Sequence, residues 1–486
     1  MSRGGSLVWF RHDLRLSDNP ALDAALRSTG PITPVFIHSP DEEGRWRPGA
    51  ASDWWLHHSL RALAQRLERQ GLPLIVRRGP ALEVLVALIE ETGATAVHWN
   101  RRYEPAVVNR DRGVKRHLRE SGIEAHSHNA ALLFEPWQIQ TRSGTAYRAF
   151  TPFWRACRQY LPPPSPLAEP VPTGRQGPVT GSLTVDALGL LPDVRWDTGL
   201  EAAWEPGEAG AHRALERFLD ATLSGYGDAR ERPAVNGTSR LSPHLHFGEI
   251  GPRQVWHAVS QHTAPVGAAE RDADRYLAEI GWREFAHHVL FHHPDFPEKP
   301  LNPSFARLPW RNESAELLRA WQRGRTGFPI VDAGMRELWE TGWMHNRVRM
   351  IAGSLLVKNL RVPWQQGEAW FWDTLVDADL ASNSLGWQWV AGSGADAAPF
   401  FRIFNPVRQS ERFDPDAEYI SRWVPEITRL PVRHRHAPWE APGEALDAAA
   451  LRLGSDYPYP IVDLKRSRRE ALEAFEAIKS NADPTG

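Results

Sequence analysis

Short apolar runs alternate with amphipathic stretches through the first third of the chain. The runs cover residues 7–10, 32–37, 74–76, 96–99 and 123–126, and their length and aliphatic content predict buried strands. Leucines recur at helical spacing between them, for example at Leu56, Leu60, Leu63 and Leu67. Buried strands that alternate with helices predict a parallel sheet covered on both faces, with ligands bound beyond the carboxyl ends of the strands.

The start of the first predicted helix and the loop before it carry further information. Asp18 and Pro20 predict a helix that begins with an aspartate cap. Arg11 and its neighbours follow the first strand in place of a G-x-G-x-x-G loop. The ordinary dinucleotide fingerprint is therefore missing, and a flavin or nicotinamide site is not predicted at this point.

The pattern changes around residues 150–210, where prolines and glycines accumulate, as in LPPPSP at 161–166. Such a run cannot be helical and predicts a connector. Helical spacing dominates from residue 211 onward, for example at 214–223, 272–291 and 346–359. We therefore predict a Rossmann-like α/β domain at 1–135, a long connector at 136–210 and an all-α domain at 211–486.

Composition narrows the classes of protein that remain. The single cysteine, Cys157, excludes an intrachain disulfide and a four-cysteine metal or iron–sulfur site. The net charge of −2 means that a nucleic-acid partner would need a local basic patch. No apolar run is long enough for a membrane span, and the first residues lack a secretory signal. We therefore expect a soluble, cytoplasmic protein, and its 22 tryptophans suggest stacking or electron transfer.

Residues 372–406 combine carboxylates, an amide and paired indoles in a run rich in glycine and alanine. The polar members are Asp377, Asp379 and Asn383, and the indoles are Trp387 and Trp389. We expect extended or tightly turned backbone here, which projects the members of each pair to opposite sides. Unpaired carboxylates are rarely buried, so they favour a site for a polar, planar cofactor. The alternative is a glycine-rich structural loop around a tryptophan cluster.

A second polar segment precedes a predicted helix at Pro243. Thr238, Ser239, Leu241 and Ser242 offer hydroxyl and backbone N–H groups at this helix start, where an anion such as a pyrophosphate binds well. An ordinary helix cap is the alternative, because serine and threonine are common there.

One predicted helix carries an acid, an indole and a guanidinium on a single face. Glu279, Trp282 and Arg283 stand at positions i, i+3 and i+4, so their side chains are neighbours. This combination suits the binding of a stacked base and a phosphate. The alternative is an exposed Glu–Arg pair of small energetic value.

A second helix repeats this spacing with an amide, a guanidinium and a thioether. These are Asn346, Arg349 and Met350, which would face one pocket together. The alternative interpretation of the methionine is a core side chain.

Four histidines gather at His287, His288, His292 and His293. No acidic or cysteine partner accompanies them at a ligand-like spacing. We expect surface or phosphate-facing histidines, and we predict no metal.

Several motifs together resemble the DNA photolyase and cryptochrome family, most closely the bacterial cyclobutane pyrimidine dimer photolyases. The resemblance covers nearly the whole chain, so a chance motif match does not account for it. The motifs are LVWFRHDLRLSDNPAL at 7–22, GTSRLSPHLHFGEI at 237–250, EIGWREF at 279–285, TGFPIVDAGMREL at 326–338, TGWMHNRVRM at 341–350, WQW at 387–389 and FRIFNP at 401–406.

The resemblance implies a set of residues for FAD and for electron transfer. The implied FAD contacts are Tyr226, Thr238, Ser239, Arg240, Leu241, Ser242, Tyr276, Arg283, Arg349, Asp377, Asp379 and Asn383. The implied electron relay from the surface to the flavin consists of Trp310, Trp364 and Trp387.

The resemblance also implies a set of residues for catalysis and for DNA. The implied catalytic residues are Glu279, Asn346, Met350 and Asn383. The implied contacts with DNA and the lesion are Arg230, Glu279, Trp282, Arg283, Asn346, Arg347, Trp389 and Gln409.

The function that the resemblance implies is light-driven repair of cyclobutane dimers in UV-damaged DNA by an electron from excited, reduced FAD. We expect a monomer and a second antenna chromophore, a methenyltetrahydrofolate or a deazaflavin, with Glu104 and residues 45–54 as candidates for its site. The alternative function is a cryptochrome-type blue-light receptor without repair. A dark flavin oxidoreductase is disfavoured because the nicotinamide fingerprint is missing.

Overall fold

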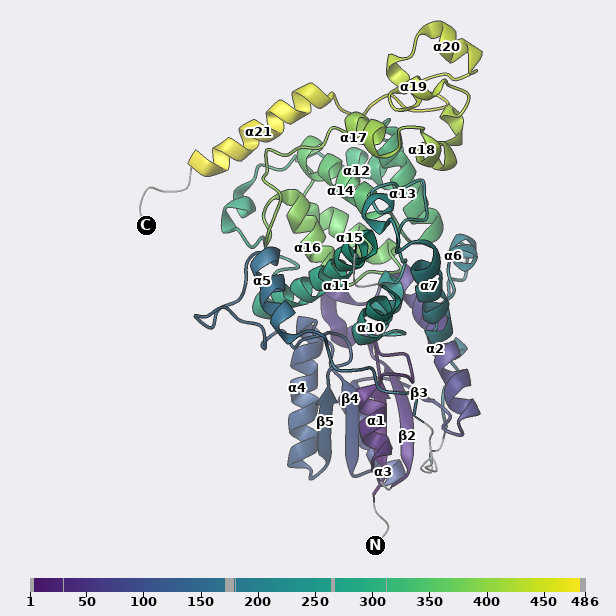
Figure 1. Cartoon of the computed structure of the whole chain (residues 1–486), viewed down its shortest axis with the longest axis vertical. Coiled ribbons are helices and arrows are strands. Elements are labelled where there is room, and N and C mark those ends of the chain that lie inside the picture. Colours follow the sequence, from purple (N-terminus) through teal and green to yellow (C-terminus); the bar gives the residue numbers. More distant parts are fainter. Residues whose placement is uncertain are drawn as a thin grey trace. The chain divides into compact units, whose positions relative to one another are not determined.

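The computed structural model describes residues 4–28, 30–170, 179, 181–263, 267–311 and 313–480 (Figure 1). The chain divides into two compact units, and neither unit is continuous in sequence. The first unit comprises Met1–Ser224, Ser239–Pro294 and Val376–Leu380. The second comprises Gly225–Thr238, Asp295–Leu375 and Ala381–Gly486. The predicted boundaries after residues 135 and 210 both lie inside the first unit, and they stay predictions.

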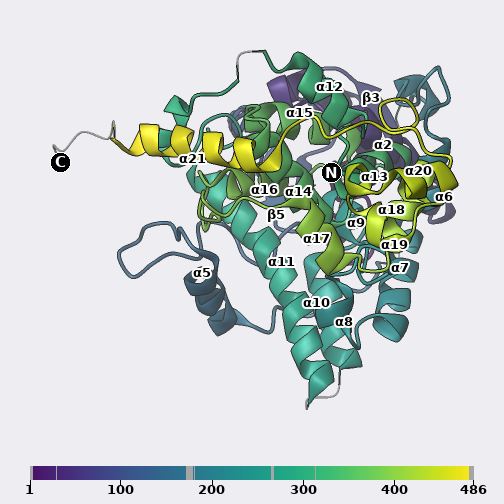
Figure 2. The same cartoon turned by 90° about the horizontal axis from the view of Figure 1, so that it is seen from above.

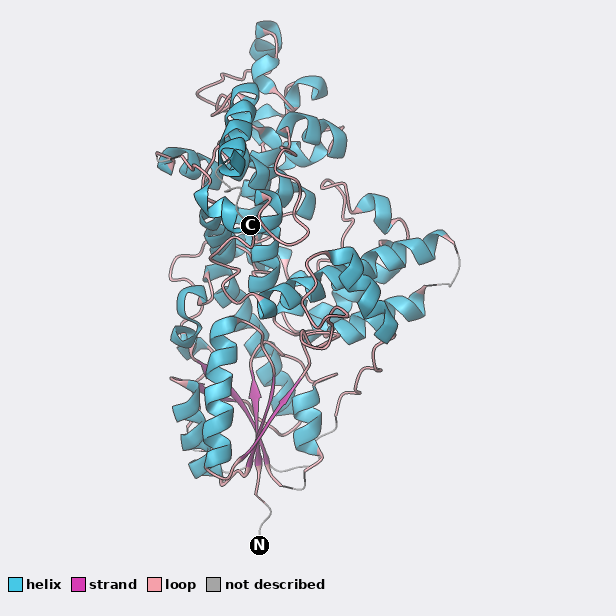
Figure 3. Ribbon diagram, turned by 90° about the vertical axis from the view of Figure 1, so that its left-hand side faces the viewer, coloured by secondary structure: helices cyan, strands magenta, loops and turns pink. Residues whose placement is uncertain are grey.

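The first unit contains a five-stranded parallel sheet, drawn in magenta in Figure 3. Its order is β3-β2-β1-β4-β5, so the chain starts at the centre and moves outward in both directions. Each observed strand overlaps a predicted one, which confirms the Rossmann-like prediction. The strands are β1 (Ser6–Phe10), β2 (Ile32–His38), β3 (Ile75–Arg78), β4 (Ala96–Asn100) and β5 (Glu124–His128).

Helices cover both faces of this sheet, as the buried strands require. Val8 packs in a core with Leu22 and Leu60, whereas its neighbour Leu7 packs in a second core with Leu85. Successive strand residues therefore serve opposite layers. The first layer contains α1 (Pro20–Leu26) and α2 (Ala50–Arg69), and the second contains α3 (Ala81–Thr92) and α4 (Pro105–Glu120).

The predicted aspartate cap of the first helix is wrong. Asn19 caps α1, because its side chain accepts a hydrogen bond from the backbone N–H of Leu22 at 3.1 Å. Asp18 precedes the cap with a positive φ of 50°, and its carboxylate accepts instead from the backbone N–H of Leu167 and from Arg253. Two polar residues in a row precede Pro20, and the sequence does not tell which one turns toward the helix.

The remaining regular elements of the first unit are helices. Residues 161–166 form no helix, as predicted. The two helices α10 (Pro252–His262) and α11 (Ala268–His292) run side by side in Figure 2. The remaining elements of this unit are η1 (Pro40–Trp46), α5 (Phe150–Cys157), η2 (Arg158–Tyr160), η3 (Asp186–Leu188), α6 (Thr198–Ala203), α7 (Glu208–Ala221), α9 (Ser242–His246), α10 (Pro252–His262) and α11 (Ala268–His292).

The second unit is built from helices, which confirms the all-α prediction for this part of the chain. None of the described helices is long and apolar enough to span a membrane. The elements are α8 (Tyr226–Ala229), η4 (Pro303–Arg307), α12 (Ala315–Gln322), α13 (Pro329–Thr341), α14 (Asn346–Ser354), the π-helical η5 (Leu355–Asn359), α15 (Trp364–Thr374), α17 (Pro406–Phe413), α18 (Glu418–Trp423), η6 (Pro425–Ile427), α19 (Val432–Arg435), η7 (Pro438–Glu440), α20 (Gly443–Ala448) and α21 (Leu464–Ser480).

The stretch that we expected to be extended or tightly turned contains a helix instead. This helix, α16, spans Leu380–Ala391 and carries Asn383, Trp387 and Trp389. Gly392 ends it with a φ of 85°, a conformation that glycine adopts without strain. The glycine therefore terminates a helix, and the expectation of extended backbone is wrong for the indole pair.

Candidate cofactor and DNA sites

Asp377 and Asp379 lie in the turn before α16, where the first unit holds both carboxylates by polar contacts. The Ser242 hydroxyl donates a hydrogen bond of 2.7 Å to Asp377. Asp377 is buried, with 9% of its surface exposed. The turn thus joins two segments that are 135 residues apart in sequence, and both belong to the predicted FAD contacts.

Asp379 forms a largely buried ion pair with a histidine of α11, and its side chain is 14% exposed. Its Oδ2 lies 3.4 Å from Nε2 of His287 and 3.8 Å from Nδ1 of His246. Burial alone would raise the pKa of Asp379, but the charges of His287 and Arg283 and hydrogen bonds with His246 and His287 together outweigh it and hold the pKa well below its usual range. Burial alone would lower the pKa of His287, but the charge and hydrogen bond of Asp379, together with a hydrogen bond to the backbone of Arg283, outweigh it and raise that pKa. The pair therefore carries opposite charges at moderately acidic pH.

The expectation of surface histidines near residue 290 is wrong for two of the four. His287 and His288 are buried, and His287 has an acidic partner from a segment 92 residues away. His288 accepts a hydrogen bond from the backbone N–H of Tyr147 at 3.0 Å, so it serves the packing of the first unit. Among the described residues, no group of three or more His, Cys, Asp or Glu side chains is arranged to hold a metal ion.

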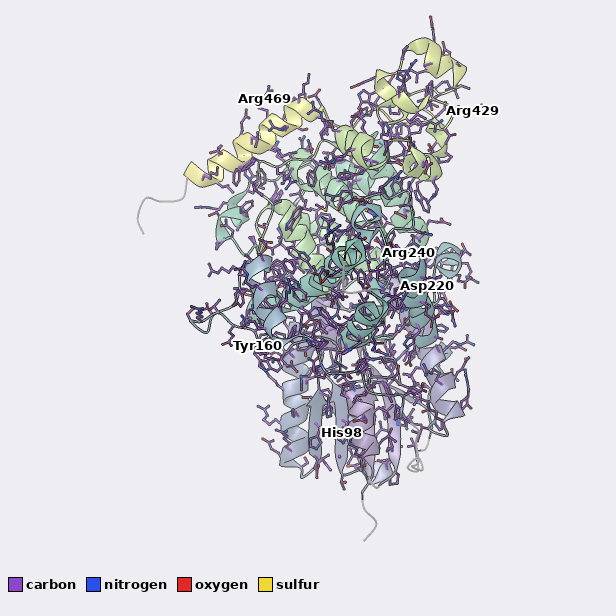
Figure 4. The ribbon with its side chains drawn as sticks, in the orientation of Figure 1. His98, Tyr160, Asp220, Arg240, Arg429 and Arg469 are labelled. Carbon is purple, nitrogen blue, oxygen red and sulfur yellow. The ribbon has the colours of Figure 1, made fainter. Side chains whose placement is uncertain are left out.

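The segment before α9 begins a helix, as predicted, and Pro243 stands in its first turn. The hydroxyl of Tyr276 donates to Oγ of Ser239 at 3.1 Å, which ties this segment to α11. Burial raises the pKa of Tyr276, so this phenol stays protonated. Arg240, labelled in Figure 4, has a positive φ of 52° and places its guanidinium 5.5 Å from the ring of Trp204. The segment is thus a fixed turn with polar groups before a helix start.

Glu279, Trp282 and Arg283 share one face of α11, as the spacing predicts. Trp282 stacks on Phe150, with ring centroids 3.9 Å apart and planes inclined by 9°. Arg283 donates to the carbonyl oxygens of Ala131 at 2.5 Å and Leu245 at 3.4 Å. The indole and the guanidinium are therefore held in position inside the first unit.

Asn346, Arg349 and Met350 lie on α14 in the second unit. Asn346 is exposed and Met350 is half-buried, so the methionine is no ordinary core side chain. Arg349 donates through Nε to the carbonyl of Met344 at 2.7 Å. This face of α14 is accessible at Asn346 and Met350 within the second unit.

His345 precedes α14 as its cap. Its Nδ1 accepts the backbone N–H of Arg347 at 3.2 Å. Burial lowers the pKa of His345 to about 3, and Arg347 and Arg349 contribute in the same direction. The imidazole is therefore neutral at physiological pH and has no proton to give as an acid there.

The predicted electron relay and the amide of Asn383 lie in the second unit. The amide of Asn383 donates to the carbonyl of Glu368 at 3.1 Å. Trp387 is buried and contacts Phe371 and Trp321, with ring centroids 5.0 and 6.1 Å away. Trp364 is also buried, and Trp310 is half-buried.

Three aromatic partners of these residues were not predicted from the sequence. Phe371 and Trp321 border Trp387, and Phe150 supports Trp282. Each is far from its partner in sequence or lies on a different helix, and an isolated aromatic residue gives no sign of its partner. The ring-to-ring distances supply information that spacing alone lacks.

The remaining predicted cofactor and DNA contacts divide between the same two units. Tyr226 is buried, and its ring lies 5.3 Å from the guanidinium of Arg230. Leu241 is buried, whereas Thr238, Trp389 and Gln409 are half-buried.

Glu104, a candidate for the antenna site, belongs to a charged group near the end of β4. Arg102 binds Glu43 and Glu104 at 2.8 and 2.9 Å. Burial would raise the pKa of Glu104, but Arg102 outweighs it and lowers that pKa to about 2. Trp54, at the end of the predicted 45–54 region, is buried in α2. A role of these residues in an antenna site stays a prediction.

Two family models match long parts of the chain. Residues 6–173 match the model described as DNA photolyase, and residues 276–477 match the model described as the FAD binding domain of DNA photolyase. The chain belongs to the DNA photolyase family and carries the FAD-binding domain of that family.

Individual relatives include both kinds of protein in this family. A deoxyribodipyrimidine photo-lyase of Agrobacterium fabrum is 48% identical over 97% of this chain and 98% of the relative. Cryptochrome-1 of Arabidopsis thaliana is 40% identical over 98% of this chain and 71% of the relative.

Solved structures give the same two kinds of neighbour. A bacterial class III photolyase from Agrobacterium tumefaciens has a TM-score of 0.94 at 48% identity, and the match covers 99% of both chains. A cryptochrome from Synechocystis has a TM-score of 0.89 at 27% identity, with 98% of this chain and 100% of the neighbour covered.

Proposed function

We infer that this protein is an enzyme that uses light to repair cyclobutane pyrimidine dimers in DNA, with FAD as its cofactor. The observation that carries this function is the 48% identity with a deoxyribodipyrimidine photo-lyase along nearly the full length of both proteins. The cryptochrome function has less support, because the Arabidopsis cryptochrome is 40% identical to this chain, whereas the photo-lyase is 48% identical. When bound, reduced FAD supplies one electron to the lesion under light and recovers it after the ring opens.

Several polar groups of the chain suit the parts of FAD. We propose that the segment Thr238–Ser242 binds the pyrophosphate, since its hydroxyl and N–H groups precede α9. Asp377 and Asp379 are proposed to accept hydrogen bonds from polar groups of the cofactor. Asn383 is proposed to face the reactive edge of the flavin ring. The remaining proposed FAD contacts are Tyr226, Tyr276, Arg283 and Arg349.

The residues proposed for the lesion supply stacking, hydrogen bonds and no acid. Trp282 and Trp389 are proposed to stack against the flipped-out pyrimidines. Glu279 and Asn346 are proposed to hydrogen bond the pyrimidine carbonyls, and Met350 to line the same pocket. The residues proposed to position the DNA backbone are Arg230, Arg283, Arg347 and Gln409.

The proposed lesion is the cyclobutane dimer and not the (6-4) photoproduct. Repair of the latter needs a proton donor, whereas the amide of Asn346 and the thioether of Met350 supply none near neutral pH. His345 supports this choice, because its pKa of about 3 leaves it neutral. Splitting a cyclobutane ring needs an electron and no such donor.

We propose that Trp387, Trp364 and Trp310 carry electrons to the oxidised cofactor under light. The close contacts of Trp387 with Phe371 and Trp321 place it among other aromatic rings. Substitution of Trp387 by Phe is expected to abolish light-driven reduction of bound FAD but to leave repair by chemically reduced enzyme intact. Photoreduction that survives all three single substitutions would contradict the relay.

We further propose a monomeric, cytoplasmic enzyme without a metal ion and with a second antenna chromophore. An archaeal photolyase from Sulfolobus tokodaii was solved with two FAD molecules, which implies a novel light-harvesting cofactor in that protein. A folate or deazaflavin is the proposed pigment here, and the absorbance spectrum of freshly purified protein tests it.

The decisive experiment gives the reduced, FAD-loaded protein two oligonucleotides of one sequence, carrying either a cyclobutane dimer or a (6-4) photoproduct. Restored thymine absorbance in the light, and not in the dark, is expected for the dimer alone. Comparable turnover of the (6-4) substrate would overturn the choice of lesion. Absence of any light-dependent repair would favour the receptor function.

A further inference from the structure

Glu231 lies in a tight turn directly after α8 in the second unit. Its backbone N–H donates to the carbonyl of Asp228 at 3.1 Å, which fixes the turn. Its carboxylate forms an ion pair and a hydrogen bond with Nη2 of Arg347, near the start of α14. An acid thus sits directly on an arginine that is proposed to contact DNA.

The guanidinium of Arg347 is otherwise held by weak contacts. Its Cζ lies 4.4 Å from the ring of Phe413, at the end of α17, and its Nη1 lies 3.9 Å from Sδ of Met350. Its Nε is buried and finds no acceptor among the described residues. The strong partner of Arg347 is therefore Glu231, and the other contacts orient the guanidinium without neutralising it.

Both members of this pair remain accessible to solvent within the second unit. The Arg347 side chain is 22% exposed and the Glu231 side chain is 35% exposed. A partly exposed ion pair is worth little free energy, because water and salt compete with it. An incoming anion can therefore replace the carboxylate without a large penalty.

The charges around this pair favour an anion. Arg230 and Arg349 join Arg347 around His345, whose pKa is lowered first by burial and further by the charges of these three arginines. A DNA phosphate offers the same oxygen acceptors as a carboxylate, and arginine binds both groups in a fork geometry. The turn of Glu231 thus places a carboxylate where the proposed function calls for a phosphate.

We propose that Glu231 is a built-in counter-ion, which occupies Arg347 in the DNA-free protein and is displaced when a DNA phosphate binds. The inference rests on the proposed function and adds a residue that weakens DNA binding. Because each binding event must break the Glu231–Arg347 pair, the carboxylate lowers the affinity for DNA and speeds the release of the repaired strand.

The exchange has a signature in the salt dependence of binding. A phosphate that binds a bare arginine releases counter-ions and adds nearly one unit to the log–log slope. A phosphate that displaces Glu231 frees a carboxylate, which attracts cations again and cancels part of that release. Removal of the carboxylate is therefore expected to steepen the slope.

The experiment compares four proteins loaded with FAD and kept in the dark. They are the wild type, Glu231→Gln, Arg347→Met and the double variant, titrated with labelled oligothymidine that carries one cyclobutane dimer or none. The matched control is Glu476→Gln on α21, which removes an exposed carboxylate paired with Lys479 at 3.0 Å. Thermal unfolding of each variant verifies that it is folded.

Glu231→Gln is expected to tighten binding to both oligonucleotides by about two- to fivefold, the size typical of a partly exposed ion pair. It is also expected to steepen the salt slope, by less than about one unit. The same substitution in the Arg347→Met background is expected to change neither quantity, because a double-mutant cycle isolates the pair. Glu476→Gln is expected to behave as the wild type.

Equal or weaker binding by folded Glu231→Gln would overturn the inference. A gain that persists in the Arg347→Met background would also overturn it, because Glu231 would then act through Arg230, whose Nε lies 3.9 Å from its carboxylate, or through more distant charges. Should Glu231→Gln be unstable, Glu231→Ser provides the same comparison. A light-dependent repair assay on the wild type distinguishes failure of the proposed function from failure of this inference. Absence of repair would refute the proposed function. Repair without an effect of Glu231→Gln on DNA binding would refute only the counter-ion role of Glu231.

Discussion

The helices α11 and α14 carry the same i, i+3, i+4 pattern of functional side chains but differ in how firmly the surroundings hold the side chains on and beside it. On α11, Trp282 is stacked on Phe150 and Arg283 is tied to two backbone carbonyls. On α14, Arg349 is also tied to a backbone carbonyl, but Asn346 is exposed. The adjacent Arg347, which lies outside the pattern, is held by a partly exposed carboxylate. The sequence pattern is therefore the same, while the contacts that hold the side chains differ.

The contrast between the two helices indicates that the surroundings, and not the spacing, decide whether a contact is fixed or exchangeable. The buried pair of Asp379 with His287 on α11 is expensive to break, because one charge would remain without a partner. The pair of Glu231 with Arg347 lies partly in water, where either charge is solvated after separation. We expect the α11 region to be preorganised and the α14 region to adapt to its ligand.

The largest expected effect is on the stability of the α11 region. Asp379→Asn leaves His287 buried without its partner and is expected to lower the free energy of unfolding by about 3–5 kcal/mol. Urea denaturation measures this loss. The control is Asp295→Asn, which removes an exposed pair with Lys299 and is expected to change the free energy by less than ~1 kcal/mol.

The pH dependence of that loss follows from the two pKa shifts. The raised pKa of His287 gives stability that is present below about pH 6.5 and is lost as pH rises through its folded pKa. The lowered pKa of Asp379 gives stability that is present above about pH 4 and is lost as pH falls through its folded pKa. The free energy of unfolding of the wild type should therefore exceed that of Asp379→Asn by the largest amount between these two pH limits. A difference that does not change with pH would contradict the ion pair.

The second effect tests whether the stacked indole of α11 reads the lesion. Trp282→Ala is expected to weaken binding to dimer-containing DNA by about 1–3 kcal/mol, the value of one base–aromatic stack, and to affect undamaged DNA less. The measurement is a pair of titrations in the dark. Trp339→Ala, which removes a tryptophan that is 58% exposed, is the matched control. Equal losses on both DNAs would show that Trp282 is only a scaffold.

The third effect concerns the cap of α14. The lowered pKa of His345 gives stability that is present above about pH 6.5 and is lost as pH falls toward about 3. His345→Asn keeps an acceptor for the backbone N–H of Arg347 but cannot take up a proton. It is expected to reduce the slope of unfolding free energy against pH by about 1.4 kcal/mol per pH unit in acid. Unfolding curves at several acidic pH values measure this slope, and an unchanged slope would contradict a neutral His345.

The smallest effect on stability is expected from loss of the ion pair between Glu231 and Arg347. Glu231→Gln is expected to change the free energy of unfolding by no more than ~1 kcal/mol, although it alters DNA binding. Thermal unfolding measured beside Asp379→Asn provides the contrast. A loss comparable to that of Asp379→Asn would mean that the α14 region is as rigid as the α11 region.

The strands and the two functional helices were predictable because their signals are local. Aliphatic runs such as residues 7–10 mark the strands, and the spacing of Glu279, Trp282 and Arg283 alone defines one face of a helix. The helix α16 was not predictable in this way. Buried residues lie on several sides of it, including Ala381 and Val390 on opposite sides, so it lacks the apolar stripe that marks an amphipathic helix.

Long-range partners were beyond the reach of the sequence. The charge on Asp379 depends on His287, 92 residues earlier, and the availability of Arg347 depends on Glu231, 116 residues earlier. Neither pair has a local signature, because a lone acid or base is typical of any surface. Only the fold shows which of these pairs is largely buried and which is partly exposed to solvent.

The short segment Val376–Leu380 is part of the first unit although it follows the bulk of that unit by more than eighty residues. Synthesis on the ribosome proceeds from the amino terminus, and domains generally fold as units during it. The first unit cannot complete its set of contacts until residue 380 has emerged, long after its sheet. During that interval His287 is without Asp379, so the nascent chain passes through a stage in which this imidazole lacks the carboxylate of its ion pair. A ribosome stalled before residue 376 should therefore display a sheet that is formed and an α11 region that is still sensitive to protease.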